Sequence, residues 1–269
     1  MRIFIIGENS RLTKAIILNS TEKIILVKKS IYSTLSDSFS IDYFIDKLML
    51  NTNDVLLVTK AIINPKHDVI DLYRWNYDFP RNLIAILEKK KLHNRVFFLG
   101  SFFEKTGIQN NYINSKRKLS HYITHSRFKF VRPHIIRLHT LFGIGLPAEN
   151  MFLGQIYYSL KNDINFEMSH GNQFRQYHDY KEISFHILNI IKSKRNKKTI
   201  ELNGDEWIQL KVLAKSIFSH FNKLHLLKIG LRSSSPFEIL NIENFNKHIY
   251  AFSPSIKLIK GYLQNLIKK

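Results

Sequence analysis

The sequence predicts an α/β protein in which a doubly wound parallel sheet is followed by a smaller mixed region. Two observations predict the sheet. A strand, a helix and a second strand follow one another within about 30 residues at the amino terminus, which is the order of a βαβ unit. Similar alternation continues through about 140 residues. A third observation, the change to short strands and helices beyond Pro147, predicts the smaller region. Such a sheet holds its ligands in a crevice at the carboxyl ends of its strands.

The elements of the first region are predicted by apolar runs and by helical spacing. Strands are expected at 2–6, 24–27, 54–58, 95–99 and 128–138. Helices are expected at 9–18, 41–50, 73–92 and 112–124, and Pro80 should interrupt the third of them. Residues 30–40 are rich in Ser and Asp and are predicted to form a loop. Together these elements predict a doubly wound sheet over residues 1–147.

The second region is predicted to be a smaller mixed domain over residues 148–269. Short strands are expected at 164–166 and 199–202, between helices at 150–160, 183–191 and 207–221. No internal repeat or low-complexity linker separates the two regions, so we expect them to share a continuous interface. Some strands and helices of the second region could return to the first.

The amino-acid composition limits the classes of protein to which the chain can belong. The 269 residues suffice for a full core, and a hydrophobic content of 44% argues against disorder. The chain has no cysteine, which excludes disulfides and thiolate metal sites, and we expect no metal. No apolar run approaches the roughly 18 residues that span a bilayer, and the amino terminus begins directly with a strand. These features predict a cytoplasmic protein without a membrane span.

The formal charge of +20 raises the question of a polyanionic partner. The basic residues are mostly spread along the chain, and the densest run, 192–198, is predicted to be a surface loop outside any recognisable nucleic-acid module. An anionic small substrate therefore explains the charge better than nucleic acid does. Nucleic-acid binding stays as a minor alternative.

Tyr112 and Lys116 stand four residues apart in a predicted helix, where positions i and i+4 share a face. A lysine charge beside a tyrosine favours the phenolate and should lower the pKa of the phenol, which would suit a proton donor. By itself the pattern also fits a half-buried aromatic residue beside a solvated lysine.

Further motifs lie in a fixed order around this pair. Residues 7–13 stand where one enzyme family has Gly-x-x-Gly-x-x-Gly, Ala61 follows the third strand, and Ser115 lies between the tyrosine and the lysine. Other matching positions are Asn76, Asn82, Arg137, the turn 142–147, the segment 171–177, Arg232 and the segment 252–254. In this order the chain resembles the extended short-chain dehydrogenase/reductases, in particular their sugar-nucleotide epimerase, dehydratase and 4-ketoreductase group.

The resemblance implies a Rossmann-like dinucleotide-binding domain over residues 1–147 and a smaller substrate-binding region over 148–269. It also implies roles for individual residues. Tyr112 would be the acid/base, Lys116 would hold the nicotinamide ribose and lower the pKa of the tyrosine, and Ser101 would bind the reacting oxygen. Slippage by one residue would put Phe102 in the place of Ser101, and a strand-end hydroxyl that caps a loop is the alternative for Ser101 itself. Cofactor contacts would come from Gly7, Ser10, Arg11, Leu12, Lys28, Lys29, Ala61 and Lys116.

Substrate contacts are implied in the second region. Arg175 and Arg232 would grip the diphosphate of a sugar nucleotide, because a guanidinium pairs two oxygens at once. Asn150 would touch the nucleotide end of the substrate or, alternatively, cap the following helix. Relatives of this kind form homodimers through the helices that correspond to 73–92 and 112–124.

The sequence departs from the family pattern in its glycine-rich loop. Only Gly7 is kept, while Ser10 and Thr13 add side chains where the backbone should approach the pyrophosphate and where the helix should pack on the strand. Lys28 and Lys29 replace the acidic residue that binds an adenosine ribose, which favours NADP over NAD.

These features lead to an expected function and an alternative. We expect an NAD(P)-dependent reductase or epimerase acting on a sugar nucleotide in surface-polysaccharide synthesis, and the short loop between Ser101 and Tyr112 favours the reductase. The altered glycine loop keeps a second hypothesis open, in which the protein is a pseudoenzyme that serves as a binding or scaffold subunit.

Overall fold

The computed structural model describes residues 1–32, 38–193, 197–234, 242 and 249–268. The chain forms two compact units. The first unit comprises Met1–Leu138 and Ser184–Glu201, and the second comprises His139–Ile183 and Leu202–Lys269. The first unit is therefore assembled from two separate stretches of the chain.

A six-stranded sheet forms the centre of the first unit, and all of its strands run parallel. The strands are β1 (Arg2–Ile6), β2 (Lys23–Val27), β3 (Val55–Val58), β4 (Arg95–Ser101), β5 (Arg132–Leu138) and β10 (Thr199–Glu201). They lie in the order β10-β5-β4-β3-β1-β2, so the direction of progression through the sheet reverses between β1 and β3. The predicted doubly wound parallel sheet is confirmed.

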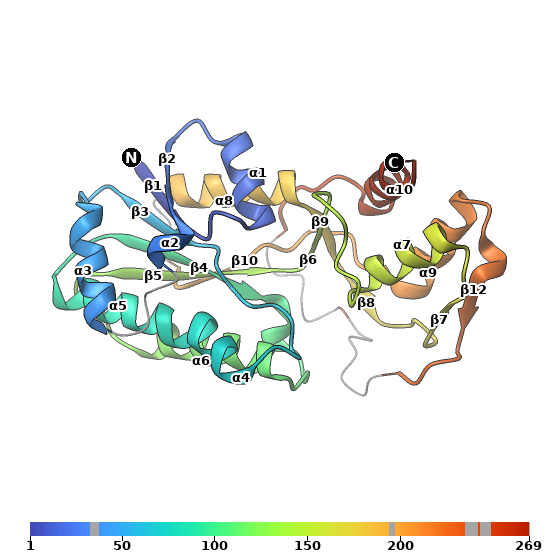
Figure 1. Cartoon of the computed structure of the whole chain (residues 1–269), viewed down its shortest axis with the longest axis horizontal. Helices are drawn as coiled ribbons and strands as arrows, with labels where there is room; N and C mark the ends of the chain where they lie inside the picture. Colours follow the sequence, from blue (N-terminus) through green and yellow to red (C-terminus); the bar gives the residue numbers. More distant parts are fainter. Residues whose placement is uncertain (33–37, 194–196, 235–241, 243–248, 269) are drawn as a thin grey trace. The chain divides into compact units, whose positions relative to one another are not determined.

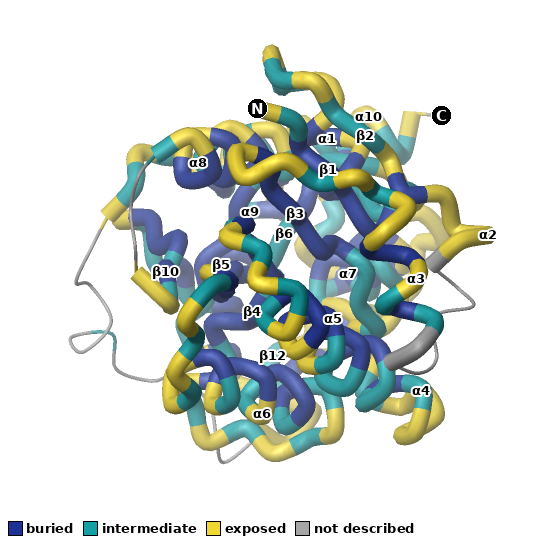
Figure 2. The backbone as a smooth tube through the Cα atoms, turned by 90° about the vertical axis from the view of Figure 1, so that its left-hand side faces the viewer, coloured by how far each residue is buried: buried dark blue, intermediate teal, exposed yellow. Residues whose placement is uncertain are grey.

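Helices cover both faces of this sheet, as Figure 1 shows. Helix α1 (Arg11–Asn19) and helix α8 (Tyr180–Lys192) lie on one face, where Asn19 donates a hydrogen bond to Ser184. Helices α3 (Ser38–Leu48), α5 (Phe79–Lys89) and α6 (Asn111–His125) lie on the other face. All four residues of β3 are buried, because a parallel sheet with helices on both faces has no solvent-facing side. Figure 2 shows the central strands among the most buried parts of the chain.

Three local expectations for the first unit need correction. Part of the predicted loop 30–40 is helical, since α2 (Lys29–Tyr32) and the start of α3 fall in it, while residues 33–37 lie outside the described part of the chain. Ser and Asp predict helix starts as readily as loops. The expected helix 73–92 consists of α4 (Val69–Tyr73), the π-helical turn η1 (Arg74–Asp78) and α5. Pro80 does not interrupt it, because it lies in the first turn of α5, where a proline is tolerated.

The second unit is built from helices and three small two-stranded sheets, β11-β8, β12-β7 and β6-β9. Its helices are α7 (Phe152–Asn162), α9 (Leu210–His220), the 3₁₀ turn η3 (Leu224–Leu226) and α10 (Ser255–Ile267). Its strands are β6 (Thr140–Phe142), β7 (Phe166–Met168), β8 (Phe174–Arg175), β9 (Tyr177–Asp179), β11 (Ile208–Gln209) and β12 (Leu227–Ile229). These elements enclose a core of their own around Ile156, Leu213, Phe218 and Ile259.

The strand expected at 199–202 does not belong to the mixed region. It is β10, which pairs with β5 at the edge of the main sheet, with Ile200 opposite Ile136. A sequence pattern identifies a strand but not its partner, which can lie far away along the chain. Within the described ranges, no helix is long and apolar enough to cross a membrane.

Candidate active site

Helix α6 presents the candidate acid/base pair on one face. The helix begins after Asn110, whose side chain accepts a hydrogen bond from the backbone N–H of Ile113 at 2.9 Å and so caps the first turn. Tyr112, Lys116 and Ser120 follow at intervals of four residues, so they lie one above the other along the helix. Lys116 and Ser120 are buried.

Lys116 reaches the carboxyl end of β4. Its Nζ donates a hydrogen bond to the backbone carbonyl of Leu99 at 2.8 Å, and only 5% of the residue is exposed. Burial lowers the pKa of Lys116 to about 8, because a charged ammonium loses its hydration there. The carboxylate of Glu104 acts in the opposite direction and favours the charged form.

The pKa of Tyr112 is shifted in the direction opposite to the one expected. The residue as a whole is half-buried, but burial of its hydroxyl group, with a smaller effect from the negative charge of Glu104, raises the pKa of Tyr112 to about 12. The expectation that Lys116 lowers this pKa is therefore wrong for the structure described. Desolvation outweighs the ammonium, which is directed at the carbonyl of Leu99. At neutral pH the phenol keeps its proton.

Ser101 lies at the end of β4 and meets the tyrosine. Its polar side chain lowers the pKa of the phenol, against the effect of burial. The same hydroxyl accepts a hydrogen bond from the backbone N–H of Phe103 at 3.3 Å, which caps the 3₁₀ turn η2 (Phe102–Lys105). Phe102 is 1% exposed and packs in the interior. Of the two registers considered, the one with Ser101 brings a hydroxyl to Tyr112.

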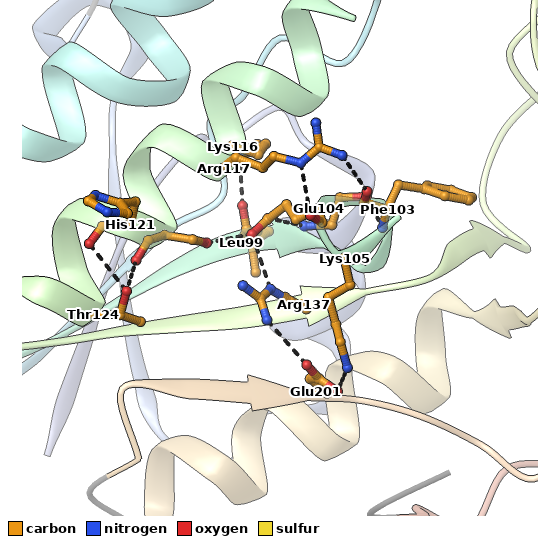
Figure 3. A network of polar contacts seen from close by, with 12 residues as sticks. Leu99, Phe103, Glu104, Lys105, Lys116, Arg117, His121, Thr124, Arg137 and Glu201 are labelled. Atoms are coloured by element: carbon orange, nitrogen blue, oxygen red, sulfur yellow. Dashed lines mark hydrogen bonds and ion pairs between the residues drawn. The ribbon is translucent and has the colours of Figure 1, made fainter. Parts of the chain in front are cut away.

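The buried carboxylate of Glu104 lies beside these residues in the first unit (Figure 3). Glu104 lies in η2, and its side chain accepts hydrogen bonds from the backbone N–H of Ser101, from Ser120 and from Arg137. Arg137 also contacts Glu201, with 3.2 Å between Nη1 and Oε1. Lys105 belongs to the same network of ion pairs, because its Nζ lies 3.0 Å from Oε2 of Glu201.

A pocket of about 240 Å³ lies where β1 and β3 end. It is lined by Gly7, Asn9, Ser10, Lys29, Thr59, Lys60 and Ala61. The strand order reverses between β1 and β3, which is the place where open parallel sheets bind ligands. Gly7 has a φ of +126°, and a Cβ there would lie 2.4 Å from Oγ1 of Thr59, so only glycine fits.

Ser10 and Thr13 replace the missing glycines with an internal hydroxyl cluster. Ser10 caps α1 by accepting a hydrogen bond from the backbone N–H of Thr13 at 3.0 Å. Thr13 is fully buried, and its hydroxyl lies 2.8 Å from both the Gly7 carbonyl and the hydroxyl of Thr59. The hydroxyls pack against one another between helix and strands, so the loop is closed by hydrogen bonds in place of a glycine contact.

The other predicted cofactor residues differ in whether they line this pocket. Arg11 and Leu12 form the first turn of α1, where Leu12 points into the core with 4% exposed. Lys28 and Lys29 are exposed at the end of β2, and only Lys29 lines the pocket. Lys60 lines it as well; burial lowers the pKa of Lys60, and the charge of Lys29 adds to that effect. Two lysines that repel each other in one pocket would gain from an anion between them.

Asn76 ties the loop after β3 to helix α6. Its side chain exchanges two hydrogen bonds with the backbone of Ile62, at 3.0 and 2.8 Å, and donates another to Ser115 at 3.1 Å. Ser115 in turn donates to the carbonyl of Tyr112 at 2.7 Å. Asn76 lies in the π-helical turn, a deviation that is frequent at functional sites. Asn82 lies in α5, where its side chain accepts hydrogen bonds from Arg81.

The candidate substrate residues all belong to the second unit. Arg175 ends β8 and donates to the carbonyl of Phe174 at 2.8 Å, and the exposed Arg232 lies 3.4 Å from Gln155. Asn150 is exposed. The alternative in which it caps a helix is wrong, because Met151 occupies the N-cap position of α7.

The basic run 192–198 lies partly outside the described residues, which exclude 194–196. Two of its lysines are engaged within the first unit. Lys192 lies 3.5 Å from Glu22, and Lys198 donates to the carbonyl of Ser126 at 2.7 Å. Among the residues that the structure describes, no group of three or more His, Asp or Glu side chains could hold a metal ion.

No protein-family model matches the chain, and no curated protein sequence matches it significantly. Solved structures do match. GDP-L-fucose synthetase from Naegleria fowleri superimposes with a TM-score of 0.73 at 12% identity, over 100% of this chain and 94% of that one. The dTDP-4-dehydrorhamnose reductase of Bacillus anthracis, in complex with NADP, gives 0.72 at 13% identity over 98% of each chain. UDP-glucuronic acid 4-epimerase from Bacillus cereus gives 0.74 at 14% identity, over 99% of this chain and 100% of that one.

The chain has the fold of these enzymes. The match extends over nearly the full length of both chains, so it includes the elements of both units. The fold expected from the motifs is thereby confirmed. At identities of 12 to 14% the likeness concerns the fold, and the reaction has to be argued from the site.

Within this fold, Glu104, Thr59 and Lys60 were not predicted as parts of a site. Glu104 follows two phenylalanines and precedes a lysine, a pattern that also suits an exposed turn. Thr59 and Lys60 directly precede Ala61, which was expected beside the cofactor. The ends of parallel strands meet at one edge of the sheet, so each polar residue that follows β3 was a candidate on that ground.

Proposed function

We propose that the protein is an NAD(P)-dependent oxidoreductase or epimerase that acts on a sugar nucleotide. The reaction we favour is reduction of a 4-keto sugar, with epimerisation at C4 as the other form of the same chemistry, in surface-polysaccharide synthesis. One observation carries the proposal: Ser101, Tyr112 and Lys116 come together at the carboxyl end of β4, where the Ser101 side chain lowers the pKa of the phenol and Lys116 donates a hydrogen bond to the carbonyl of Leu99.

The state of these groups suits a proton donor. With a pKa of about 12, Tyr112 carries its proton at neutral pH and can give it to the oxygen of a ketone as that oxygen gains charge. The Ser101 hydroxyl can hold the same oxygen and orient it toward the phenol. Lys116, whose pKa of about 8 lies above neutral pH, remains mostly charged there and donates a hydrogen bond to the carbonyl of Leu99. These properties favour reduction over abstraction of a proton.

The residues around the pocket at the ends of β1 and β3 fit a phosphate-bearing cofactor. Gly7 lets the backbone approach closely, Ser10, Arg11 and Leu12 begin helix α1, and Ala61 leaves space beside β3. Lys29 and Lys60 would pair with phosphate oxygens, and with Lys28 nearby they favour NADP over NAD. When bound, a nicotinamide dinucleotide would supply or accept the hydride, which no side chain of the protein can do.

The sugar nucleotide is assigned to the second unit. Arg175 and Arg232 would bind the diphosphate and Asn150 the nucleotide end, as in the family that the sequence resembles. Support comes from one of the structures with the same fold, a 4-epimerase in complex with UDP-glucuronic acid and NAD.

The substitution Tyr112→Phe tests the proposal. We expect turnover of a 4-keto sugar nucleotide with NADPH to fall by roughly 100-fold to 10,000-fold, because the general acid is lost. NADPH binding and the thermal unfolding midpoint should be retained. The matched control is Tyr43→Phe, since Tyr43 is 61% exposed on α3 and should have no effect. Undiminished turnover by the Tyr112 variant would remove the assignment.

A binding or scaffold subunit without turnover is the second candidate. Two observations favour it, namely the attachment of the Lys116 ammonium to the Leu99 carbonyl and the hydroxyl cluster that takes the place of the glycines. Titration with NADPH and NADH separates the candidates. Binding of either at micromolar affinity supports the enzyme, and the absence of binding supports the scaffold.

We also propose a homodimer in the cytoplasm. In the family that the sequence resembles, the helices corresponding to α5 and α6 pair between subunits, and nicotinamide cofactors are available inside the cell. Sedimentation equilibrium of the purified protein tests the first part, and a sedimenting mass of 31.8 kDa would contradict it. Fractionation of the producing cells tests the second.

A further inference from the structure

We propose that Glu104 is a positioning residue for Tyr112 and Lys116: its buried carboxylate fixes the end of β4 against helix α6 and supplies the negative charge that both groups face. The inference rests on the proposed function for its importance in turnover. The electrostatic coupling between Glu104, Tyr112 and Lys116 does not depend on which substrate is used.

Glu104 is held by donors from three different elements. Its Oε1 accepts a hydrogen bond from the backbone N–H of Ser101 at 2.7 Å, at the end of β4. Its Oε2 accepts from the hydroxyl of Ser120 in α6 and from Nε of Arg137 in β5, the latter at 3.1 Å. The side chain is 1% exposed. A carboxylate with this set of donors has one position, and it joins the three elements there.

Two of these donors connect Glu104 directly to the catalytic pair. Ser101 is the residue whose hydroxyl meets Tyr112, so a hydrogen bond to its backbone fixes the origin of that side chain. Ser120 lies one turn beyond Lys116 on the same face of α6. The carboxylate thus sets the distance between the strand that carries Ser101 and the helix that carries Tyr112.

Gly100 provides the space for this arrangement. A Cβ at that position would lie 2.6 Å from Oε1 of Glu104 and 2.7 Å from Cγ2 of Ile135. The backbone of β4 therefore comes close to the carboxylate only because residue 100 has no side chain. This close fit indicates that the carboxylate belongs to the built interior of the first unit.

The cations around Glu104 do not fully neutralise its negative charge, so this charge also acts on Tyr112 and Lys116 in α6. Arg137 in β5 faces it but is shared with Glu201 in β10, which also pairs with Lys105 in η2. Arg117 in α6 meets Glu104 at its backbone carbonyl, which accepts a hydrogen bond from Nε at 2.9 Å, and its other nitrogens donate to Asn114 and to the carbonyl of Thr106. The charge of Glu104 raises the pKa of both Lys116 and Tyr112. It keeps the lysine charged and the phenol protonated.

The variant Glu104→Gln tests this role, because it keeps the shape of the side chain and removes its charge. The pKa values of Tyr112 and Lys116 are measured in the full-length protein without substrate, by ¹³C NMR of labelled tyrosine and lysine, with Tyr112→Phe and Lys116→Met to assign the signals. We expect both pKa values to fall, that of Tyr112 below about 12 and that of Lys116 below about 8. The alkaline limb of the kcat profile should move down in pH with them.

The direction of the Lys116 shift separates an electrostatic role from a merely structural one. If Glu104 only held the corner together, its replacement would let water in, and the pKa of Lys116 would rise toward 10.5. That rise, or unchanged pKa values for both groups, would overturn the proposal. Glu201→Gln is the matched control, since Glu201 belongs to the same network but is not among the groups that shift either pKa. It should leave both values in place.

A second variant keeps the test valid if Glu104→Gln does not fold. Glu104→Asp keeps the charge and withdraws it by one methylene, so both pKa values should fall below those of the unchanged protein; values equal to those of the unchanged protein would overturn the proposal. Because these titrations need no turnover, a failure of the proposed enzyme activity would leave their outcome intact.

Discussion

Lys116 shows how a single residue can be predicted by its spacing while its state depends on the fold. Its position four residues after Tyr112 predicted a shared helix face, and the structure has that face. The expected effect on the tyrosine was wrong, because a spacing contains no information about burial. Both groups lose hydration at the end of β4, and desolvation of their charged forms is the largest effect on each pKa.

The pH dependence of folding stability should reveal the buried lysine. Its pKa is about 8 in the folded chain and 10.5 in a free side chain, so the unfolded chain binds more protons between these values. Stability should therefore rise with pH across that window. In Lys116→Met this rise should disappear, as measured by urea unfolding at several pH values. Tyr112 acts in the opposite sense above pH 10, where the folded chain holds its proton longer.

The comparison between Lys116→Met and the unchanged protein isolates this effect, because the other ionisable groups are common to both. Parallel stability curves for the two proteins across the window would show that Lys116 titrates normally, and the account of its burial would then be wrong.

At the scale of elements, helix α6 and the strands of the sheet follow from sequence periodicity, while the π-helical turn η1 does not. The pattern predicted one helix over 73–92, and the structure inserts a wider turn that brings Asn76 inward. The amide satisfies both backbone groups of Ile62 in the loop after β3. A requirement of this kind comes from a distant segment, so local propensity cannot predict it.

Asn76→Ala should destabilise the first unit by about 2–3 kcal/mol, because it leaves the N–H and C=O of Ile62 without their partner. The measurement is the free energy of unfolding in urea. Asn82→Ala is the control, since it removes the same side chain from α5, where the amide meets only Arg81. It should change stability by less than about 0.5 kcal/mol. Equal losses for the two variants would contradict the bridging role of Asn76.

At the scale of the whole molecule, the α/β class and the parallel order of the sheet were predictable, but the course of the chain was not. The alternation of strands and helices predicted the sheet. The return of 184–201 to the first unit depends on which surface α8 and β10 cover, and a sequence pattern does not name a partner. Arg175, Arg232 and Asn150 lie in the second unit, as their place in the chain suggested.

A fragment that ends at residue 147 should fail to unfold cooperatively. It would lack α8, with its buried Ile187 and Ile191, and β10, which pairs with β5. One face of the sheet and one edge would then be exposed to water. Circular dichroism during heating measures this, with the full chain as reference. A sharp transition at the same temperature in the fragment would show that 1–147 folds independently.

The pairing of β5 with β10 has a consequence for synthesis on the ribosome. Ile136 pairs with Ile200, so the last strand of the sheet is made long after the strand it joins. Contacts between residues far apart in sequence form slowly, since the intervening chain must first be ordered. The nascent sheet keeps an open edge at β5 until residue 201 has emerged, and by then 139–183 have already been made. During elongation between these points the open edge of β5 is available for pairing with a wrong strand.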